Sequence, residues 1–284
     1  MGENDWIILQ TIHSERNITK AAEKLYLSQP ALTYRLKQIE KEFGTKIVYR
    51  GKRGIEFTPQ GEYLVQYAHN MLSLLRQTKE HMNNMDNKVR GTLRLGVSSL
   101  FARYQLAPIL KNFLAQYPEV EINVTTGWSS AVIQSVFKEE VHVGIIRGDH
   151  NWPEQKMLLK EEKVCLVSDS PVPFEDLPNL PRINYSTDSS LKNLIQNWWN
   201  EMYRQPPLIT MEVDRIETCL EMVQHGLGYG LFPSLCLHDR DNLFTADLLD
   251  RDGQPIIRKT SLIYRNTATR LSVIRAFVNF LAAN

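Results

Sequence analysis

One short segment of the chain carries side chains that could read double-stranded DNA. A helix that begins after Ser28 would place four apolar residues on one face, Ala31, Leu32, Leu36 and Ile39. Its opposite face would then carry polar and cationic residues, Gln29, Thr33, Tyr34, Arg35 and Lys37. In the major groove glutamine pairs with adenine and arginine with guanine, while lysine neutralises phosphate. Because a cationic helix face is more often simply solvated, this face needs supporting elements before it indicates DNA binding.

The flanking residues predict the elements that would position this face. Thr19 is the expected N-cap of a preceding short helix, whose small alanines let two helices approach closely. Ser28 would cap the second helix, with Pro30 in its first turn, where a missing N–H group costs nothing. Residues 50–54 (RGKRG) place three cations around two glycines, as expected for the tip of a hairpin. The order predicts a helix-turn-helix followed by a basic wing that lies against the sugar–phosphate backbone.

These landmarks resemble the N-terminal domain of the LysR-type transcriptional regulators. The shared features are the Ala21-Ala22 pair, the Ser-Gln-Pro-Ala stretch at 28–31 and the Glu-x-x-x-Gly pattern that ends at Gly44. Threonine at 33 replaces the family's usual serine, and Ile-Val-Tyr-Arg at 47–50 replaces Leu-Phe-x-Arg; both changes keep the residue type. The resemblance assigns DNA contacts to Thr19, Ser28, Gln29, Pro30, Thr33, Tyr34, Arg35, Lys37, Arg50, Lys52 and Arg53.

The resemblance covers the whole chain and implies three parts. A winged helix-turn-helix DNA-binding domain, rich in α-helix, would occupy residues 1–58, and a long dimerisation linker helix residues 59–89. Residues 90–284 would form a two-lobed α/β effector domain like a periplasmic binding protein, with lobe I at 90–162 and 265–284 and lobe II at 163–264. The implied partners are double-stranded promoter DNA, a small-molecule effector and further copies of the chain, as a homodimer through the linker helix and a homotetramer. RNA polymerase is a further candidate partner, and no cofactor or metal is expected.

Charge and apolar patterning agree with a DNA-binding protein of the bacterial cytoplasm. The net charge is only +1, yet residues 16–56 hold ten basic and four acidic side chains, so the positive charge is local. No apolar run approaches the roughly 20 residues of a membrane span, and no secretory signal opens the chain. Three widely spaced cysteines, Cys165, Cys219 and Cys236, are expected to be buried and reduced, with a redox pair of Cys219 and Cys236 as the alternative.

A long helix is expected to begin at Thr58-Pro59, because threonine caps helices and proline suits the first helical position. Helical spacing continues to about residue 88, a length of roughly 45 Å at 1.5 Å per residue. Its apolar stripe runs through Leu64, Tyr67, Met71, Leu74 and Thr78, then drifts to Leu75, Met82 and Val89. By resemblance this stripe pairs with the same helix of a second subunit; the alternative is packing on the chain's own effector domain.

From residue 90 onward strand and helix patterns alternate, which predicts α/β lobes with parallel sheets. Strands are expected at 92–97, 120–125, 141–146, 163–167, 230–232 and 259–264. Helices are expected at 106–117, 130–138, 189–203, 217–225 and 271–282. By resemblance the chain would cross between lobes near 160–164 and 261–265. The Gly-x-Gly-x-Gly stretch at 226–230 follows a helix and precedes a strand, the reverse of a dinucleotide-binding loop.

Polar residues at the carboxyl ends of these strands predict where a ligand would bind. Two hydroxyl pairs follow the first two strands, and two arginines lie at strand ends of different lobes: Ser98, Ser99, Ser129, Ser130, Arg147 and Arg258. Hydroxyl and N–H groups at helix starts favour an anion, and guanidinium binds carboxylate bidentately. The set suits a small polycarboxylate. The alternatives are that the serines only cap helices and that the arginines pair with acidic residues of their own lobes.

Three short motifs sharpen this expectation. Residues 98–100 (SSL), 141–143 (VHV) with the Arg-Gly at 147–148, and 255–258 (PIIR) resemble the citrate-sensing catabolite-control branch of the LysR family. His142 stands where most LysR regulators carry aspartate, and that branch shares the change. The resemblance therefore implies citrate as the effector, with a different metabolite as the alternative.

Two other function classes compete with a regulator. A solute-binding receptor would fit the two lobes, but the basic N-terminal segment and the missing export signal argue against it. An enzyme would need a catalytic constellation, yet none of the seven histidines stands in a metal or nucleophile motif. The sequence therefore favours a non-enzymatic transcription factor whose effector changes how paired DNA-binding domains hold promoter DNA.

Overall fold

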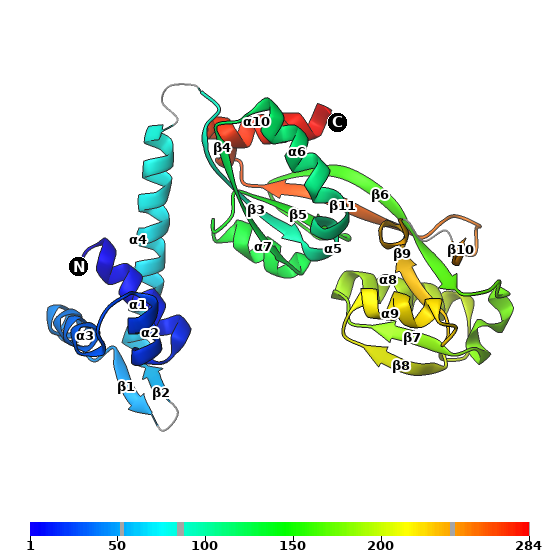
Figure 1. The fold of residues 1–284 in the computed structure, drawn as a ribbon, viewed down its shortest axis with the longest axis horizontal. Coiled ribbons are helices and arrows are strands. Elements are labelled where there is room, and N and C mark those ends of the chain that lie inside the picture. The colour runs from blue at the N-terminus through cyan, green and yellow to red at the C-terminus, as the bar shows by residue number, and fades with distance from the viewer. Residues whose placement is uncertain (52–53, 84–87, 239–241, 284) are drawn as a thin grey trace. The chain divides into compact units, whose positions relative to one another are not determined.

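The computed structural model describes residues 1–51, 54–83, 88–238 and 242–283, and it divides into two compact units, Met1–Met85 and Asp86–Asn284. The first unit is mainly helical with a small hairpin, and the second consists of two α/β lobes (Figure 1). This arrangement confirms the predicted fold class. Within the described residues, no helix is both long enough and apolar enough to cross a membrane.

The first unit contains the predicted helix-turn-helix and wing. Its elements are α1 (Glu3–Glu15), α2 (Ile18–Lys24), α3 (Gln29–Phe43), β1 (Val48–Gly51), β2 (Gly54–Phe57) and α4 (Pro59–Asn83). The strands β1 and β2 pair antiparallel as the hairpin of the wing. Two wing residues, Lys52 and Arg53, lie outside the described part of the chain. The core joins the helices and the wing through Leu9, Ile12, Ala21, Leu32, Ile39 and Ile47.

Local side-chain chemistry sets where these helices begin. Ser28 caps α3 as predicted, because its Oγ accepts a hydrogen bond from the Ala31 N–H at 3.3 Å. The prediction for α2 was wrong: Asn17, not Thr19, is the cap, and its Oδ1 accepts from the Lys20 N–H at 3.1 Å. The helix begins one residue before Thr19, which lies within the first turn. Ala31 is exposed, so only Leu32, Leu36 and Ile39 form the buried face of α3.

The wing is fixed to the start of α4 by a close backbone approach. The Thr58 hydroxyl donates to the Lys46 carbonyl at 2.7 Å and accepts from the Gly61 N–H at 2.9 Å. A Cβ atom at Gly61 would lie 2.1 Å from the Ile47 carbonyl oxygen, a distance that no side chain tolerates. Glycine at 61 therefore lets the helix start directly against the strand segment that precedes β1.

The apolar stripe of α4 divides into a buried and an exposed part. Leu64 and Ala68 are buried in the core of the first unit, so the expectation that Leu64 belongs to an intersubunit seam was wrong. Further along, Tyr67, Leu74 and Met82 are 43%, 54% and 65% exposed. The predicted continuation to residue 88 passes through residues 84–87, outside the described part. The exposed half of the stripe is the part left for a partner.

Lobe I of the second unit is a mixed sheet between helices. Its strands are β3 (Gly91–Ser98), β4 (Val120–Gly127), β5 (Val143–Arg147), β11 (Ile257–Tyr264) and the first half of β6 (Gln155–Ser168). The helices α6 (Ala107–Gln116) and α10 (Ser272–Ala283) cover one face, and α7 (Ser129–Phe137) covers the other (Figure 1). Three-residue α5 (Ser99–Phe101) and a π-helical turn (Ala102–Leu106) precede α6. The prediction of parallel strands holds for β3, β4 and β5, whereas β11 and β6 pair antiparallel.

Lobe II is built on the second half of β6. This half pairs antiparallel with β9 (Gly230–Pro233) and β10 (Phe244–Asp247), and β7 (Arg182–Tyr185) pairs parallel with β8 (Ile209–Val213). The helices α8 (Ser189–Met202) and α9 (Ile216–Gln224) match the predicted segments within two residues at each end. The short strands β7, β8 and β10 were not predicted.

The chain crosses between the lobes twice. The first crossing lies within β6, near the expected residues 160–164. The second falls earlier than expected, because Thr260 to Tyr264 pair with β5 and the Val164 N–H donates to the Ile256 carbonyl at 2.9 Å. Residues 260–264 therefore belong to lobe I and not to lobe II. Their buried Leu262 and Ile263 supply the apolar surface that holds them there.

Candidate DNA-binding face and effector cavity

The outward face of α3 presents most of the residues predicted to contact DNA. Tyr34 is 65% exposed, and Lys37 is exposed on the same helix. Gln29 and Thr33 lie one helical turn apart, and the Gln29 Nε2 donates to the Thr33 Oγ1 at 3.0 Å. This bond keeps the glutamine side chain along the helix surface, where its amide can meet a base edge.

Arg35 is held differently from its neighbours. Its Nε donates to the Asp5 Oδ1 at 2.5 Å and its Nη2 to the Asp5 Oδ2 at 2.7 Å, a bidentate ion pair between α3 and α1. The Asp5 side chain is only 2% exposed and also accepts from the Gly2 N–H at 2.8 Å. The hydrogen bond from Arg35 lowers the pKa of Asp5. A base contact by Arg35 stays a prediction, and it would have to compete with this ion pair.

A cavity of about 350 Å³ lies between the two lobes of the second unit. Its walls are the carboxyl ends of β3, β4 and β5 together with residues 185–188, which begin with the last residue of β7, and residues 214–217, which follow β8. This is where open α/β sheets bind ligands. Four of the six residues predicted for an effector line it: Ser98, Ser99, Arg147 and Arg258.

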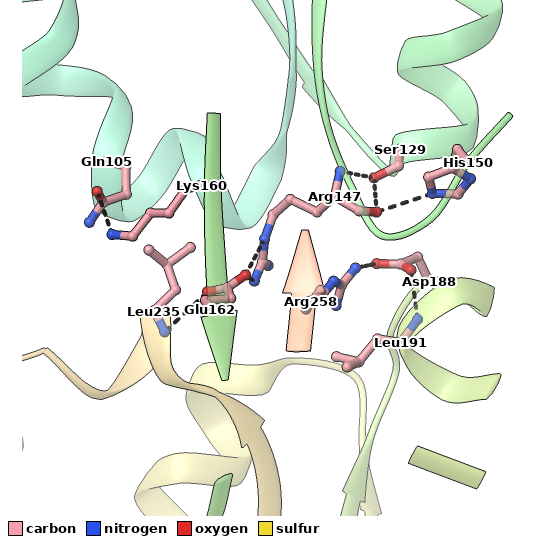
Figure 2. A network of polar contacts seen from close by, with 10 residues as sticks. All are labelled: Gln105, Ser129, Arg147, His150, Lys160, Glu162, Asp188, Leu191, Leu235 and Arg258. Carbon is pink, nitrogen blue, oxygen red and sulfur yellow. Dashed lines mark hydrogen bonds and ion pairs between the residues drawn. The ribbon is translucent and has the colours of Figure 1, made fainter. Parts of the chain in front are cut away.

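Arg147 forms a buried ion pair at this cavity. Its side chain is 1% exposed, and its Nε and Nη2 both donate to the Glu162 Oε1, the former at 3.0 Å (Figure 2). The other Glu162 oxygen accepts from the Leu235 N–H at 3.3 Å. Because Glu162 lies on β6 and Leu235 follows β9, the two contacts of Glu162 connect Arg147 of lobe I to lobe II. Arg147 therefore has a carboxylate partner before any ligand arrives.

Arg258 pairs with a carboxylate that also caps a helix. Its Nη2 donates to the Asp188 Oδ2, while the Asp188 Oδ1 accepts from the Leu191 N–H at 3.0 Å at the start of α8 (Figure 2). Burial and the nearby charge of Arg147 lower the pKa of Arg258. The Arg258 Nε is buried and has no hydrogen-bond partner among the described residues. Arg258 thus lines the cavity and keeps one donor without a partner among the described residues.

The remaining arginines around the cavity are also paired. Arg103 lies 3.3 Å from Glu217 and Arg215 lies 3.7 Å from Asp214, both measured from the arginine Nε to a carboxylate oxygen. Each of the four arginines that line the cavity among the described residues therefore has an acidic neighbour. The residues of the cavity wall thus include serines with hydroxyl groups and Arg258 with its unpaired Nε, within a lining of nearly balanced charge.

The second predicted serine pair does not line this cavity. The Ser129 hydroxyl is buried, accepts from the Arg147 N–H at 3.0 Å and donates to the Arg147 carbonyl at 3.1 Å. Ser130 is exposed on α7 and is absent from the cavity wall. His142 is buried away from the cavity, where its Nδ1 accepts from the Arg94 N–H at 3.1 Å. Ser129 and His142 thus support the fold around Arg147 and β3.

Sequence reasoning missed the contribution of lobe II to the cavity. The missed lining residues include Trp128, Tyr185, Ser186, Thr187, Asp188, Asp214, Arg215 and Glu217. The polar run at 186–190 (STDSS) before a predicted helix was a usable signal, because it resembles the hydroxyl pairs after the first strands. It was overlooked because β7, whose end positions it, was not predicted.

The three cysteines are free and buried. Burial raises the pKa of Cys165, Cys219 and Cys236 to about 12, so each is a neutral thiol at physiological pH. The Cys219 thiol donates to the Ile183 carbonyl at 3.5 Å within an apolar cluster that also contains Cys236. Because the thiolate is the reactive form, this setting agrees with the expected buried, reduced state.

Comparisons with known proteins cover both units. Residues 4–62 match the family model "Bacterial regulatory helix-turn-helix protein, lysR family", and residues 86–284 match "LysR substrate binding domain". Two Bacillus subtilis (strain 168) proteins, described as uncharacterized HTH-type transcriptional regulators YraN and YkuM, are 46% and 37% identical. These alignments cover 99% and 96% of this chain and 97% and 94% of those proteins.

Solved structures agree on the fold. Full-length CbnR complexed with its target DNA matches with a TM-score of 0.74 over 100% of this chain and 99% of that chain, at 17% identity. The full-length Vibrio cholerae virulence activator AphB matches with a TM-score of 0.64 over 100% and 99%, at 16% identity. At these identities the structural matches show the fold alone. The two family models and the two relatives show that the chain belongs to the LysR family of DNA-binding transcriptional regulators with an effector-binding domain, and is not an enzyme.

Proposed function

We propose that this regulator recognises promoter DNA through α3 and the wing, and that a small organic acid in the cavity between the lobes controls it. The observation that carries the effector part is the Arg258 Nε, a buried donor without a partner among the described residues at the wall of that cavity. A buried polar group of this kind is expected to be satisfied when the functional ligand is bound. The hydroxyl groups of Ser98 and Ser99 lie on the same wall and supply further hydrogen bonds.

The charge balance of the cavity bears on which acid binds. Citrate is the specific candidate from the motif resemblance, but it carries several negative charges. Arg147 and Arg258 already have carboxylate partners, so a polycarboxylate bound to both would compete with Glu162 and Asp188 for them. A singly charged hydroxy acid would need only the free Arg258 donor and the serine hydroxyls. The charge balance therefore favours the simpler acid over citrate.

The DNA-binding part of the proposal assigns different roles along α3. Gln29 and Tyr34 are proposed to contact bases, and Lys37 and the wing residues Arg50, Lys52 and Arg53 to contact phosphate. Thr19, Ser28, Pro30, Thr33 and Arg35 are proposed to complete the interface. The support is the exposure of α3 together with the fold match to CbnR, which was solved with its target DNA.

Two variants test these roles in a binding assay across operator sequences and salt concentrations. Gln29→Ala is expected to change the preference between sites, because it removes a base contact. Lys37→Ala is expected to weaken all sites alike and to reduce the salt slope by about one. Unchanged site preference in Gln29→Ala would show that the base contacts are assigned to the wrong residue.

The exposed half of α4 supports a homodimer. Leu74 is 54% exposed on a helix whose apolar residues Leu64 and Ala68, nearer its start, are buried. We expect Leu74→Glu to dissociate the assembly in sedimentation experiments, and Arg76→Glu on the same helix to serve as the matched charge control. A homotetramer and a contact with RNA polymerase are proposed on family grounds only.

The effector is tested by thermal unfolding of the full chain with citrate, malate, lactate and acetate at constant ionic strength. A saturable rise in melting temperature identifies the acid. Ser99→Ala should weaken its binding roughly 2- to 10-fold, the value of one hydrogen bond of about 0.5–1.5 kcal/mol. Ser130→Ala removes a comparable helix-start serine outside the cavity and should bind like the parent. Equal affinities in both variants would place the effector elsewhere.

A further inference from the structure

A second cavity, of about 330 Å³, lies in lobe II beside the first. Its lining comes mainly from β7, β8 and α8, and among the described residues it shares Trp128 and residues 185–187 with the effector cavity. Arg182, at the start of β7, lines the second cavity and not the first. This arginine has a setting unlike those of Arg147 and Arg258.

Arg182 is a buried cation without an anion. The residue is 9% exposed, and within the described part of the chain no carboxylate lies within ion-pairing distance of it. Its Nε is buried and lacks any hydrogen-bond partner among the same residues. Its guanidinium lies over the Trp199 ring, 5.4 Å from the centroid. By contrast, Arg147 and Arg258 each pair with a carboxylate.

The buried charge of Arg182, without a carboxylate partner, destabilises the folded protein when no ligand is bound. A buried charge is normally paired, and an unpaired one loses its hydration without compensation. Burial lowers the pKa of Arg182, but an arginine remains protonated in proteins. An apolar side chain would fill the same space over Trp199 with less loss of hydration. The charge of Arg182 is therefore explained by a partner that the described part of the folded chain does not supply.

The surroundings of Arg182 define the chemistry of that partner. Lys192 on α8 is a second cation in the lining, and the only acidic lining residue in the described chain is the exposed Glu212. Asn184, Ser186, Thr187 and Gln196 are uncharged polar residues of the lining, while Ile195, Ile209 and other apolar residues form an apolar part of the wall. We propose that this cavity is a second ligand site, which binds a small organic anion through its acid group on Arg182 and its apolar remainder on the wall. This proposal does not depend on which ligand binds at Arg258.

The test uses the full chain and two probes, sodium propionate and inorganic phosphate, in thermal unfolding at constant ionic strength. The parent is expected to show a saturable rise in melting temperature with at least one probe. Arg182→Met should lose this rise while unfolding at the same or a higher temperature without the probe, because it removes an unpaired buried charge. Ser99→Ala, which alters only the first cavity, should keep the rise.

A second variant protects the test against a folding defect in Arg182→Met. Lys192 is exposed, so Lys192→Gln should fold normally and weaken probe binding several-fold through the loss of its charge. An unchanged probe affinity in Lys192→Gln, a rise retained in Arg182→Met, or no saturable rise in the parent would each overturn the proposal. Loss of the rise in Ser99→Ala would assign the binding to the first cavity and overturn it as well.

Discussion

Glu162→Gln is expected to destabilise the second unit strongly. The Arg147 and Glu162 side chains are 1% and 3% exposed, and the substitution leaves the arginine as an uncompensated buried charge. Breaking a buried ion pair by removing one partner costs about 3–5 kcal/mol. For a unit of this size each kcal/mol lowers the melting temperature by about 2–4 °C, so the expected fall is roughly 6–20 °C.

The assay is thermal unfolding of the full chain, monitored by calorimetry so that the unfolding of the two units can be resolved as separate transitions. Glu161→Gln is the matched control, because Glu161 is the preceding residue of the same strand but is half exposed. Its carboxylate lies 3.8 Å from the Lys259 ammonium in solvent. Removing such a surface charge is expected to change stability by no more than about 0.5 kcal/mol.

A double variant distinguishes the effect of losing the ion pair between Arg147 and Glu162 from the effect of leaving the Arg147 charge buried and unpaired. Arg147→Met with Glu162→Leu replaces both partners by apolar side chains, so no buried charge is left unpaired. Such replacements are often neutral or stabilising, and the double variant should regain most of the stability that Glu162→Gln loses. The reasoning is refuted if Glu162→Gln and Glu161→Gln have the same melting temperature. It is also refuted if the double variant is less stable than Glu162→Gln.

Three further outcomes follow from the structure. The depressed pKa of Asp5 means that its pair with Arg35 stabilises the first unit above about pH 4 and loses this effect as the pH falls further; Asp5→Asn should flatten the acid unfolding curve of that unit. The buried thiols should react with an aromatic disulfide reagent only in denaturant, as a thiol assay at about pH 7.5 would show. Gly61→Ala should greatly reduce soluble protein and DNA binding, because its Cβ would clash with the Ile47 carbonyl.

Much of the fold was predictable because short-range chemistry specifies it. Ser28 and Pro30 mark the start of α3, and Thr58-Pro59 marks that of α4, without any knowledge of tertiary contacts. The directions of β6 and β11 were not predictable in this way, because the two crossings between lobes set them. The strands β7, β8 and β10 have only four or five residues each and are partly exposed, so their apolar patterns are too short to identify.

Of the candidate effector site, the arginines could be predicted from the sequence, but the carboxylates that pair with them could not. Arg147 was found because it ends an apolar strand, where a charge has to face an opening or a partner. Its partner Glu162 depends on strand register and on side-chain direction, which the sequence does not show: Glu162 lies opposite Arg258 in the ladder yet pairs with Arg147. The actual partner of Arg258, Asp188, comes from 70 residues away in the chain. Charge pairing around the cavity is thus the part of the site that only the three-dimensional structure shows.

The ion pairs of Arg147 and Arg258 determine which substitutions can report effector binding without also changing stability. A lost effector response in Arg147→Ala would combine two effects, because the substitution removes a cavity donor and also leaves Glu162 buried without its cation. The same ambiguity applies to Arg258→Ala, which releases the aspartate that caps α8. Ser99→Ala keeps both ion pairs, and Arg182→Met removes a charge that has no carboxylate partner in the described chain. A loss of ligand response without a loss of stability in these two variants would therefore report binding at the first and second cavities separately.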